Sequence, residues 1–433
     1  MSNDPRKHVV IVGGGFGGLW TTRALASADV RITLIDRRNH HLFQPLLYQV
    51  ATAGLSAPDI AAPLRHILRK QANVEVRLGE VVGLDAVARN VTLADGEVIG
   101  YDYLLLASGA THAYFGHDEW AQYAPGLKTL DDALHIRRRV LTAFERAEAT
   151  DDEAERAAWL HFAVVGGGPT GVELAGTLAE IAHKTLRREF RRIDPSQAKV
   201  RLIEAGPRVL SSFPESLSEK ARAQLQRLGV EVVTGTPVGA IGRDGYSLGA
   251  EFVPARTVLW AAGVAASPLG ALLDAPRDRA GRVRVEPDLT VPGYPDIFVA
   301  GDLASIQQAN GQPVPGVAPG AKQMGSYVAR AIRARLSGRT IDAFRYVDYG
   351  NLATIGRRAA VVDLRGFKFS GFLAWAFWLA AHVFFLIGFR NRLIVMLNWS
   401  WAYFTYQRHA RIIFGGAGED GAPGDQRKDA ADV

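Results

Sequence analysis

The sequence predicts an α/β fold with two Rossmann-like dinucleotide-binding domains, followed by a C-terminal region of amphipathic and hydrophobic helices that anchors the chain at a membrane. Three observations predict this fold. A hydrophobic strand running into a glycine-rich loop occurs twice, at residues 8–18 and 161–171. Each loop is followed by a helical stretch and a second strand that ends in a carboxylate, the order of a βαβ unit. Residues 372–389 are apolar or glycine except for one histidine.

The composition limits the chemistry that the chain can carry. Its 433 residues give room for two or three domains. Cysteine is absent, which excludes disulfides, iron–sulfur clusters, thiolate metal sites and a dithiol redox relay. No spacing of histidines suggests a metal site, so any redox chemistry must reside on a bound organic cofactor. The net charge of +6 comes without a long basic run, so a surface facing anionic lipid is expected and nucleic acid is not.

The first glycine loop reads Gly13-x-Gly15-x-x-Gly18 and follows the strand His8–Val12. Gly13 permits the tight turn, Gly15 lets the backbone approach a pyrophosphate, and Gly18 allows the helix to lie close to the strand. The N-terminus of that helix faces the phosphates. Asp36 ends the next strand, where its carboxylate is placed to accept hydrogen bonds from an adenosine ribose.

The second glycine loop reads Gly166-x-Gly168-x-x-Gly171, and its second strand ends at Glu204. The interval between loop and acid exceeds the usual roughly 20 residues, and the extra length near 183–195 indicates a basic extension of the helix. A carboxylate here binds a ribose diol and repels a 2′-phosphate, which favours NADH over NADPH. One such loop is weak evidence, whereas two in full strand–loop–helix–strand context are strong.

Three further strands join the two copies into one architecture. Two of them end in the small residues Ser108-Gly109 and Ala262-Gly263, which let the chain pass close to a bound nucleotide. The third ends at Gly301-Asp302. Up to about residue 345 the chain resembles the two-dinucleotide flavoprotein family, in which that Asp binds the ribityl chain of FAD. The resemblance implies that the first copy binds FAD and that the second, inserted into the FAD domain, binds NADH.

The segment 37–54 narrows the choice within that family. Disulfide reductases of this architecture carry a redox cysteine pair here, and this chain has none. The run Gln44-Pro45-Leu-Leu-Tyr48 resembles type II NADH dehydrogenases, the single-subunit NADH:quinone oxidoreductases that pump no protons. In that family this run lies beside the flavin ring. Ordinary turn contacts remain the alternative for Gln44 and Tyr48.

A second segment resembles the Ala-Gln-x-Ala-x-Gln quinone-site motif of the same family, with Ala318, Ala321 and Gln323 matching. Pro319 replaces the first Gln, so one polar contact to the quinone is missing or supplied elsewhere. Pro319 fits the first turn of a helix, whose N-terminus would stabilise negative charge on reduced flavin. Gln323 can hydrogen-bond a quinone carbonyl, or it can be an exposed surface residue. Lys322 steadies an anionic intermediate or is a solvated lysine.

The resemblance implies a mechanism in which hydride passes from NADH to FAD, and two electrons with two protons then pass to the quinone. Glu173, just after the second glycine loop, is the candidate proton relay, and the alternative is a helix-start carboxylate that favours the helix dipole. The expected catalytic residues are Glu173, Gln323 and Lys322. The expected FAD residues are Gly13, Gly15, Phe16, Gly18, Asp36, Arg37, Gln44, Pro45, Ser108, Gly109, Gly301, Asp302, Ala318 and Ala321. The expected NADH residues are Gly166, Gly168, Gly171, Glu173, Glu204, Ala262 and Gly263, and the expected quinone residues are Gln44, Ala318, Pro319 and Gln323.

The apolar stretch 372–389 would extend about 27 Å as a helix, near the thickness of a hydrocarbon core. After it, Trp, Tyr and Arg alternate with aliphatic residues through 390–411, a pattern that suits a membrane interface. The family resemblance implies helices lying in the interface, and hydropathy alone does not separate these from one spanning helix. We favour the monotopic arrangement, because it keeps the arginines on the side of the catalytic body. No secretory signal precedes the first strand, so the cytoplasmic face of the inner membrane is expected.

Other functions are known on the same fold, and the sequence argues against two of them. Sulfide:quinone oxidoreduction on the same fold needs redox cysteines, and a soluble ferredoxin reductase would lack the apolar C-terminus. A non-enzymatic NADH-sensing membrane flavoprotein stays open as an alternative function. The choice of ubiquinone or menaquinone and pairing into a homodimer also stay open.

The predicted domains are 1–115 with 280–345 for FAD, 116–279 for NADH, 346–414 for membrane association and 415–433 for a disordered tail.

Overall fold

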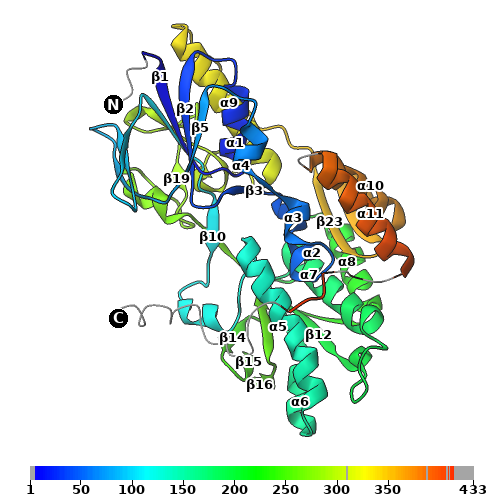
Figure 1. Cartoon of the computed structure of the whole chain (residues 1–433). Helices are drawn as coiled ribbons and strands as arrows, with labels where there is room; N and C mark the ends of the chain where they lie inside the picture. Colours follow the sequence, from blue (N-terminus) through cyan, green and yellow to red (C-terminus); the bar gives the residue numbers. More distant parts are fainter. Residues whose placement is uncertain (1–4, 309–310, 387–388, 406–407, 409, 414–433) are drawn as a thin grey trace, which may run out of the picture. The chain divides into compact units, whose positions relative to one another are not determined.

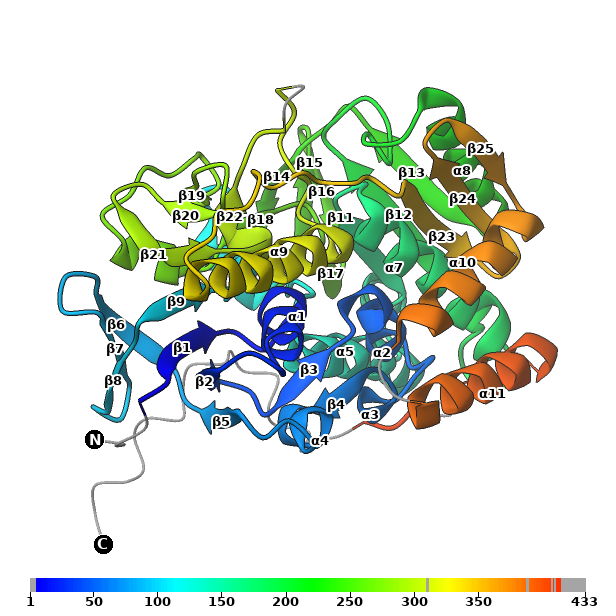
Figure 2. The same cartoon turned by 90° about the horizontal axis from the view of Figure 1, so that it is seen from above.

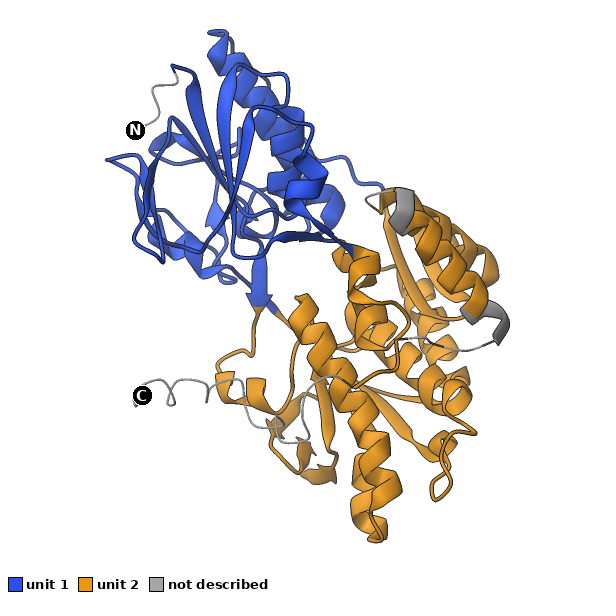
Figure 3. Cartoon of the chain, viewed as in Figure 1, with its two compact units in different colours: residues 1–42, 61–111, 264–349 blue, residues 43–60, 112–263, 350–433 orange. Residues whose placement is uncertain are grey.

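The chain folds into two compact units, each built around a parallel sheet that carries one of the glycine loops. The computed structural model describes residues 5–413 apart from 309–310, 387–388, 406–407 and 409 (Figure 1). The units comprise residues 1–42, 61–111 and 264–349, and residues 43–60, 112–263 and 350–433 (Figure 3).

The first unit is centred on a six-stranded sheet of order β20-β21-β9-β1-β2-β5. Its central strand β1 pairs in parallel with β2 and β9, and the hydrophobic run that predicted it is buried on both faces. Helices α1 and α9 lie side by side (Figure 2). The bounds are β1 Lys7–Val12, α1 Phe16–Ala24, β2 Val30–Asp36, β5 Val74–Leu78, β9 Tyr103–Leu106, β20 Thr290–Val291, β21 Tyr294–Val299 and α9 Ala318–Leu336.

Smaller elements surround this sheet. An antiparallel three-stranded sheet forms from β6, β7 and β8, and short two-stranded pairs form from β3 with β4, β10 with β18, and β19 with β22. The bounds are β3 His40–Leu42, β4 Ala61–Pro63, α4 Leu64–Leu68, β6 Val81–Asp85, β7 Asn90–Leu93, β8 Val98–Gly100, β10 Ala110–His112, β18 Val264–Ala266, β19 Val283–Arg284 and β22 Ala304–Ser305.

The second unit is centred on a four-stranded parallel sheet of order β13-β12-β11-β17. Helix α5 begins with a capping box in which Thr129 and Asp132 satisfy each other's backbone N–H groups. An antiparallel sheet of β14, β15 and β16 lies in the same unit. The bounds are α2 Leu47–Ala51, α3 Ala57–Ile60, α5 Leu130–Ala149, α6 Glu153–Trp159, β11 His161–Val165, α7 Pro169–Glu180, β12 Lys199–Glu204, α8 Glu215–Arg227, β13 Val230–Thr234, β14 Val238–Ile241, β15 Gly245–Leu248, β16 Glu251–Pro254 and β17 Thr257–Trp260.

The long interval between the second glycine loop and Glu204 extends α7, as the sequence predicted. A π-helical turn over Ile181–Thr185 continues α7, and a 3₁₀ turn at Pro195–Gln197 leads into β12. His183 in this turn lies within hydrogen-bonding distance of two carbonyls, those of Leu228 at 3.0 Å and Ala198 at 3.2 Å. The extension of α7 therefore packs against the rest of the second unit through His183.

The C-terminal region differs from the prediction of helices alone, because it begins with a three-stranded antiparallel sheet. Its first strand, β23, packs on α7, where a Cβ added to Gly176 would stand 1.7 Å from the Ile355 carbonyl oxygen. Only glycine allows that approach. The bounds are β23 Asn351–Gly356, β24 Ala359–Leu364, β25 Phe367–Ser370, α10 Phe372–Phe385 and α11 Phe389–Thr405.

The apolar stretch 372–389 is not one helix, so the single helix that hydropathy alone had left open beside interfacial helices does not form. Helix α10 ends at Phe385, because Leu386 has left the helical region with ψ of 135°. In the described part of the chain, no helix combines the length and the apolar character needed to cross a membrane.

The compact units divide the chain differently from the predicted domains. Residues 43–60 belong to the second unit because α2 packs on α5 and α7, and residues 350–413 belong to it because β23 packs on α7. The second unit thus joins the predicted NADH domain to the predicted membrane-associating region. The predicted tail, 415–433, lies outside the described residues.

Candidate functional site

The first glycine loop has the geometry that its spacing predicted. Gly13 has φ of +106°, and a Cβ there would stand 2.4 Å from the Ala107 carbonyl oxygen. A Cβ on Gly18 would stand 1.8 Å from the Gly13 carbonyl oxygen, whereas one on Gly15 would meet no atom within 4 Å. Gly13 and Gly18 therefore close the turn, and Gly15 leaves the space in which a pyrophosphate can approach.

Both polar groups of the middle glycine, Gly14, are held by side chains. Its N–H donates to the Asp36 carboxylate at 2.6 Å, and its carbonyl accepts from His41 Nδ1 at 2.9 Å. Burial lowers the pKa of His41 to about 4, so the imidazole is neutral at neutral pH. These two contacts fix the Gly14 peptide in the middle of the loop.

The second glycine loop repeats the first. Gly166 has φ of +111° with Ala261 against it, a Cβ on Gly171 would stand 1.8 Å from the Gly166 carbonyl oxygen, and Gly168 faces no atom within 4 Å. The N–H of the middle glycine, Gly167, donates to Glu204 at 2.6 Å. The other Glu204 oxygen accepts from the Gly206 N–H at 2.7 Å, so the carboxylate is rigidly placed.

The remaining residues predicted for FAD in the first unit fit such a cofactor. The Ser108 hydroxyl is buried without a hydrogen-bond partner among the described residues, which leaves it for a ligand. Asp302 lies in a 3₁₀ turn directly after β21, and Gly301 has φ of +73° with the start of α9 close by, its Cβ position 3.4 Å from Ala321. Arg37 is exposed and lies 3.7 Å from Glu80.

Two predicted FAD residues lie in the other unit. Gln44 and Pro45 open a 3₁₀ helix in the second unit, whereas Phe16 and the glycine loop belong to the first. Phe16 starts α1 and contacts the His41 ring edge-on, with 5.0 Å between centroids. The role of Gln44 and Pro45 at the flavin therefore stays a prediction.

The start of α9 agrees in part with the quinone motif. Pro319 lies in the first helical turn, as predicted. The Gln323 amide, however, bonds at both ends to the Val347 backbone, donating to its carbonyl and accepting from its N–H at 2.9 Å each. The Lys322 ammonium lies 4.5 Å from the Trp20 ring centroid, and burial lowers its pKa to about 8. Lys322 is therefore not a fully solvated lysine.

Glu173 is the most perturbed carboxyl group among the predicted residues. It lies in the second turn of α7, because the helix starts at Pro169, and only 9% of it is exposed. Burial raises its pKa well above the usual 4.5, although a backbone hydrogen bond from Thr354 lowers it. The alternative of a charged carboxylate in the first turn does not fit, since the helix-dipole effect fades beyond that turn. Burial therefore favours the protonated form of Glu173.

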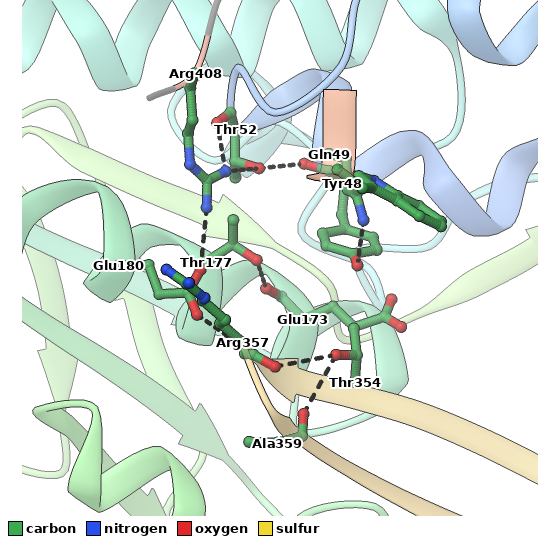
Figure 4. Close-up of polar contacts among 12 residues, drawn as sticks. Tyr48, Gln49, Thr52, Glu173, Thr177, Glu180, Thr354, Arg357, Ala359 and Arg408 are labelled. Carbon is green, nitrogen blue, oxygen red and sulfur yellow. Dashed lines mark hydrogen bonds and ion pairs between the residues drawn. The ribbon is translucent and has the colours of Figure 1, made fainter. Parts of the chain in front are cut away.

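A buried polar network near Glu173 escaped the sequence analysis (Figure 4). The Arg408 guanidinium pairs with Glu180 at 3.1 Å and donates to the Thr52 carbonyl at 3.0 Å. The backbone N–H of Arg357 also donates to Glu180. This network ties the C-terminal segment to α7 and to the segment after α2. No local pattern pairs residues so distant in sequence.

Comparison with known proteins identifies the family. Residues 7–325 match the model described as pyridine nucleotide-disulphide oxidoreductase, and residues 349–408 match the NDH2 C-terminal domain. The type II NADH:quinone oxidoreductase Ndh of Mycobacterium tuberculosis is 46% identical, over 93% of this chain and 90% of its own. The chain belongs to the type II NADH:quinone oxidoreductase family. The resemblance inferred from the motifs is thereby confirmed.

Solved structures share the fold of this type II family member. NDH2 from Plasmodium falciparum, solved in complex with NADH, superposes with a TM-score of 0.87 at 21% identity, covering 95% of this chain and 100% of that one. The sulfide:quinone oxidoreductase of Aquifex aeolicus gives 0.71 at 22% identity, covering 89% and 92%. The second likeness is one of fold, since a chain without cysteine lacks the thiols that the sulfide reaction was expected to need.

Replacing Glu173 with Gln is expected to change how stability depends on pH. A raised folded-state pKa means that unfolding releases a proton above pH 4.5, so the wild type loses stability as pH rises from there toward the folded pKa. Glu173→Gln cannot titrate. Between pH 4.5 and the folded-state pKa of Glu173, the free energy of unfolding of the variant minus that of the wild type should therefore increase with pH. The expected slope is about 1.4 kcal/mol per pH unit. Thermal midpoints between pH 4.5 and 8 measure this, and the exposed control Glu219→Gln should show no such trend. A constant difference across the range would contradict a buried neutral Glu173.

Proposed function

We propose that the chain catalyses NADH:quinone oxidoreduction without pumping protons. Hydride leaves NADH, and two electrons with two protons reach a membrane quinone. FAD, when bound, supplies the carrier between the two substrates, since the chain has no cysteine to do so. The observation that carries the proposal is the pair of matching glycine loops, each closed by a carboxylate, in a chain of this family.

The first unit is proposed to hold FAD and the second NADH. Asp36 and Ser108 would bind the adenosine and pyrophosphate side of FAD, and Asp302 its ribityl chain. In the second unit, both oxygens of Glu204 accept backbone N–H groups, which keeps a fixed negative charge beside the loop. That charge accepts hydrogen bonds from a ribose diol and repels a 2′-phosphate.

Steady-state oxidation of NADH and NADPH with a short-chain quinone, on detergent-solubilised protein, tests this proposal. We expect kcat/KM to be about a hundredfold higher for NADH, because a like-charge contact costs a few kcal/mol. Glu204→Gln should narrow that ratio chiefly through the KM for NADPH. Equal use of the two nucleotides would contradict the role of Glu204, and a wild type that oxidises neither with quinone would favour the NADH-sensing alternative.

The proposed quinone residues come from the start of α9 and from the segment before α2. Ala318 and Pro319 leave room for a flat headgroup, and Gln323 would hydrogen-bond its carbonyl after releasing Val347. Gln44 is also proposed to contact the quinone. Lys322 would stabilise negative charge that develops during electron transfer. Glu173 would deliver a proton, because burial raises the pKa of its carboxyl group and so favours the protonated form.

Glu173→Gln should separate the two half-reactions in rapid-mixing experiments. The amide cannot donate a proton by dissociation, so oxidation by quinone should slow by about 100-fold, the usual contribution of a general acid. Reduction by NADH should change little, because that step transfers hydride. Unchanged rates in both half-reactions would remove Glu173 from the mechanism.

The C-terminal helices are proposed to hold the protein on the cytoplasmic face of the inner membrane as a monotopic protein. Their support is a set of large apolar side chains that face solvent, with Leu373 71% exposed. Concentrated exposed apolar side chains on helices are typical of membrane-interface binding. The exposed residues of this apolar surface are Phe372, Leu373, Phe377, Phe384, Phe385, Leu393, Met396, Leu397 and Trp401.

Vesicle flotation tests the membrane proposal. The triple variant Leu373→Gln, Phe384→Gln and Leu397→Gln should bind anionic vesicles at least about tenfold more weakly, because each substitution removes apolar surface that would be buried in lipid. The control variant changes Val87 and Phe252, which are exposed apolar residues elsewhere, to Gln. Equal losses in the two variants would contradict a specific role for the apolar surface.

A further inference from the structure

A hydrogen-bond chain of three side chains lies in the second unit and leads away from α11. The Trp399 indole N–H donates to Gln49 Oε1 at 2.7 Å, and Gln49 Nε2 donates to the Tyr48 hydroxyl oxygen at 2.9 Å. Figure 4 shows the second of these contacts, with Tyr48 and Gln49 on neighbouring positions of α2. The chain thus connects a helix of the apolar surface to the phenol of Tyr48.

The chemistry of the three groups fixes the direction of the chain. An indole N–H can only donate, so the Gln49 atom that faces Trp399 must be the amide oxygen. The amide nitrogen then faces Tyr48, and because that nitrogen can only donate, the phenolic oxygen must accept. The hydroxyl hydrogen of Tyr48 is consequently directed away from Gln49. This assignment needs no observed hydrogen positions.

That hydrogen has no acceptor among the residues that the structure describes. Tyr48 is only 4% exposed, so bulk water does not meet the need. Burial is the largest cause that raises the pKa of Tyr48 well above 10, which favours the phenol over the phenolate. Buried polar groups in proteins are rarely left without a partner. A ligand that supplies an acceptor is the simplest way to satisfy this one.

Aromatic side chains hold the donor in place. The Trp378 ring is 2% exposed and lies 6.5 Å from the Tyr48 ring and 5.7 Å from the Trp399 ring, between centroids. Such contacts restrict the rotamers of all three rings. Tyr48 is therefore a hydrogen-bond donor held in a fixed position away from bulk water. A quinone offers carbonyl oxygens that accept hydrogen bonds and no group that donates them.

We propose that Tyr48 donates a hydrogen bond to a carbonyl oxygen of the quinone, and that Gln49 and Trp399 are positioning residues that direct its hydroxyl hydrogen. The inference rests on the proposed quinone reduction and adds a substrate-binding residue to it. It assigns no proton transfer to Tyr48, which remains a phenol throughout. Glu173 remains the proposed proton donor.

Tyr48→Phe removes only the hydroxyl group and is the first test. With a short-chain quinone, kcat/KM should fall by about 3- to 10-fold, the usual effect of one neutral hydrogen bond, with most of the change in KM. With ferricyanide, which presents no carbonyl oxygen, the rate should be unchanged. The matched control is Tyr114→Phe, whose hydroxyl donates to the Ala124 carbonyl at 2.9 Å. Tyr114→Phe should leave unchanged both kcat/KM with the quinone and the rate with ferricyanide.

Trp399→Phe tests the direction of the chain. Without the indole donor, the Gln49 amide is free to turn and to accept the Tyr48 hydrogen itself. The quinone would then lose its donor, so Trp399→Phe should raise the quinone KM as Tyr48→Phe does and leave the ferricyanide rate unchanged. The double variant should add little to either single loss, as expected for residues that act through one contact. Additive losses, or equal losses with ferricyanide, would show a merely structural role for Trp399.

The outcomes separate this inference from the function on which it rests. A wild type that reduces ferricyanide but no quinone would overturn the proposed function. A wild type active with quinone, together with a Tyr48→Phe variant of unchanged quinone kinetics, would overturn only the inference. That result would mean that the hydroxyl meets a trapped water or serves turn contacts alone.

Discussion

One hydrogen bond, made twice, orients the phosphate-binding parts of both units. In each unit the N–H of the middle glycine donates to the carboxylate that ends the next parallel strand, Gly14 to Asp36 and Gly167 to Glu204. The bond fixes the loop at the helix N-terminus, where the backbone N–H groups and the helix dipole favour phosphate. It also fixes the carboxylate beside the loop, where the proposed function places a ribose. The same interaction thus holds in place both groups that the proposed function assigns to the nucleotide, the loop and the carboxylate.

In the second unit, two acidic side chains are buried, and burial favours their protonated forms. Glu173 and Tyr48 both have raised pKa values because they lie away from water. Burying a neutral acid costs much less than burying its charged form. The result is a region that offers hydrogens to an acceptor-only molecule, bordered by the polar network in which Arg408 is paired with Glu180. The chemistry proposed for a quinone needs such donors.

Features with a local signal could be predicted from the sequence, and long-range pairings could not. Both glycine loops and the Pro319 turn follow from spacing within a few residues, and the structure agrees with them. The prediction of helices alone in the C-terminal region missed the sheet of β23, β24 and β25. These strands are short, and their hydrophobic pattern is hard to distinguish from the apolar stretch that follows them. The bond of Gln323 to Val347 was also missed, because it depends on where a distant segment folds back. The role of Glu173 stays a prediction, and its place in the second turn of α7 follows from Pro169, which starts that helix.

The most direct test follows the absorbance of bound flavin in the absence of oxygen. It shows whether NADH reduces the flavin and whether a quinone then oxidises it again. Protein purified in detergent should be yellow, should lose its visible flavin absorbance when one equivalent of NADH is added, and should regain it when a short-chain quinone follows. NADPH should bleach it far more slowly. Protein that carries no flavin, or whose flavin stays oxidised in the presence of NADH, would contradict the account.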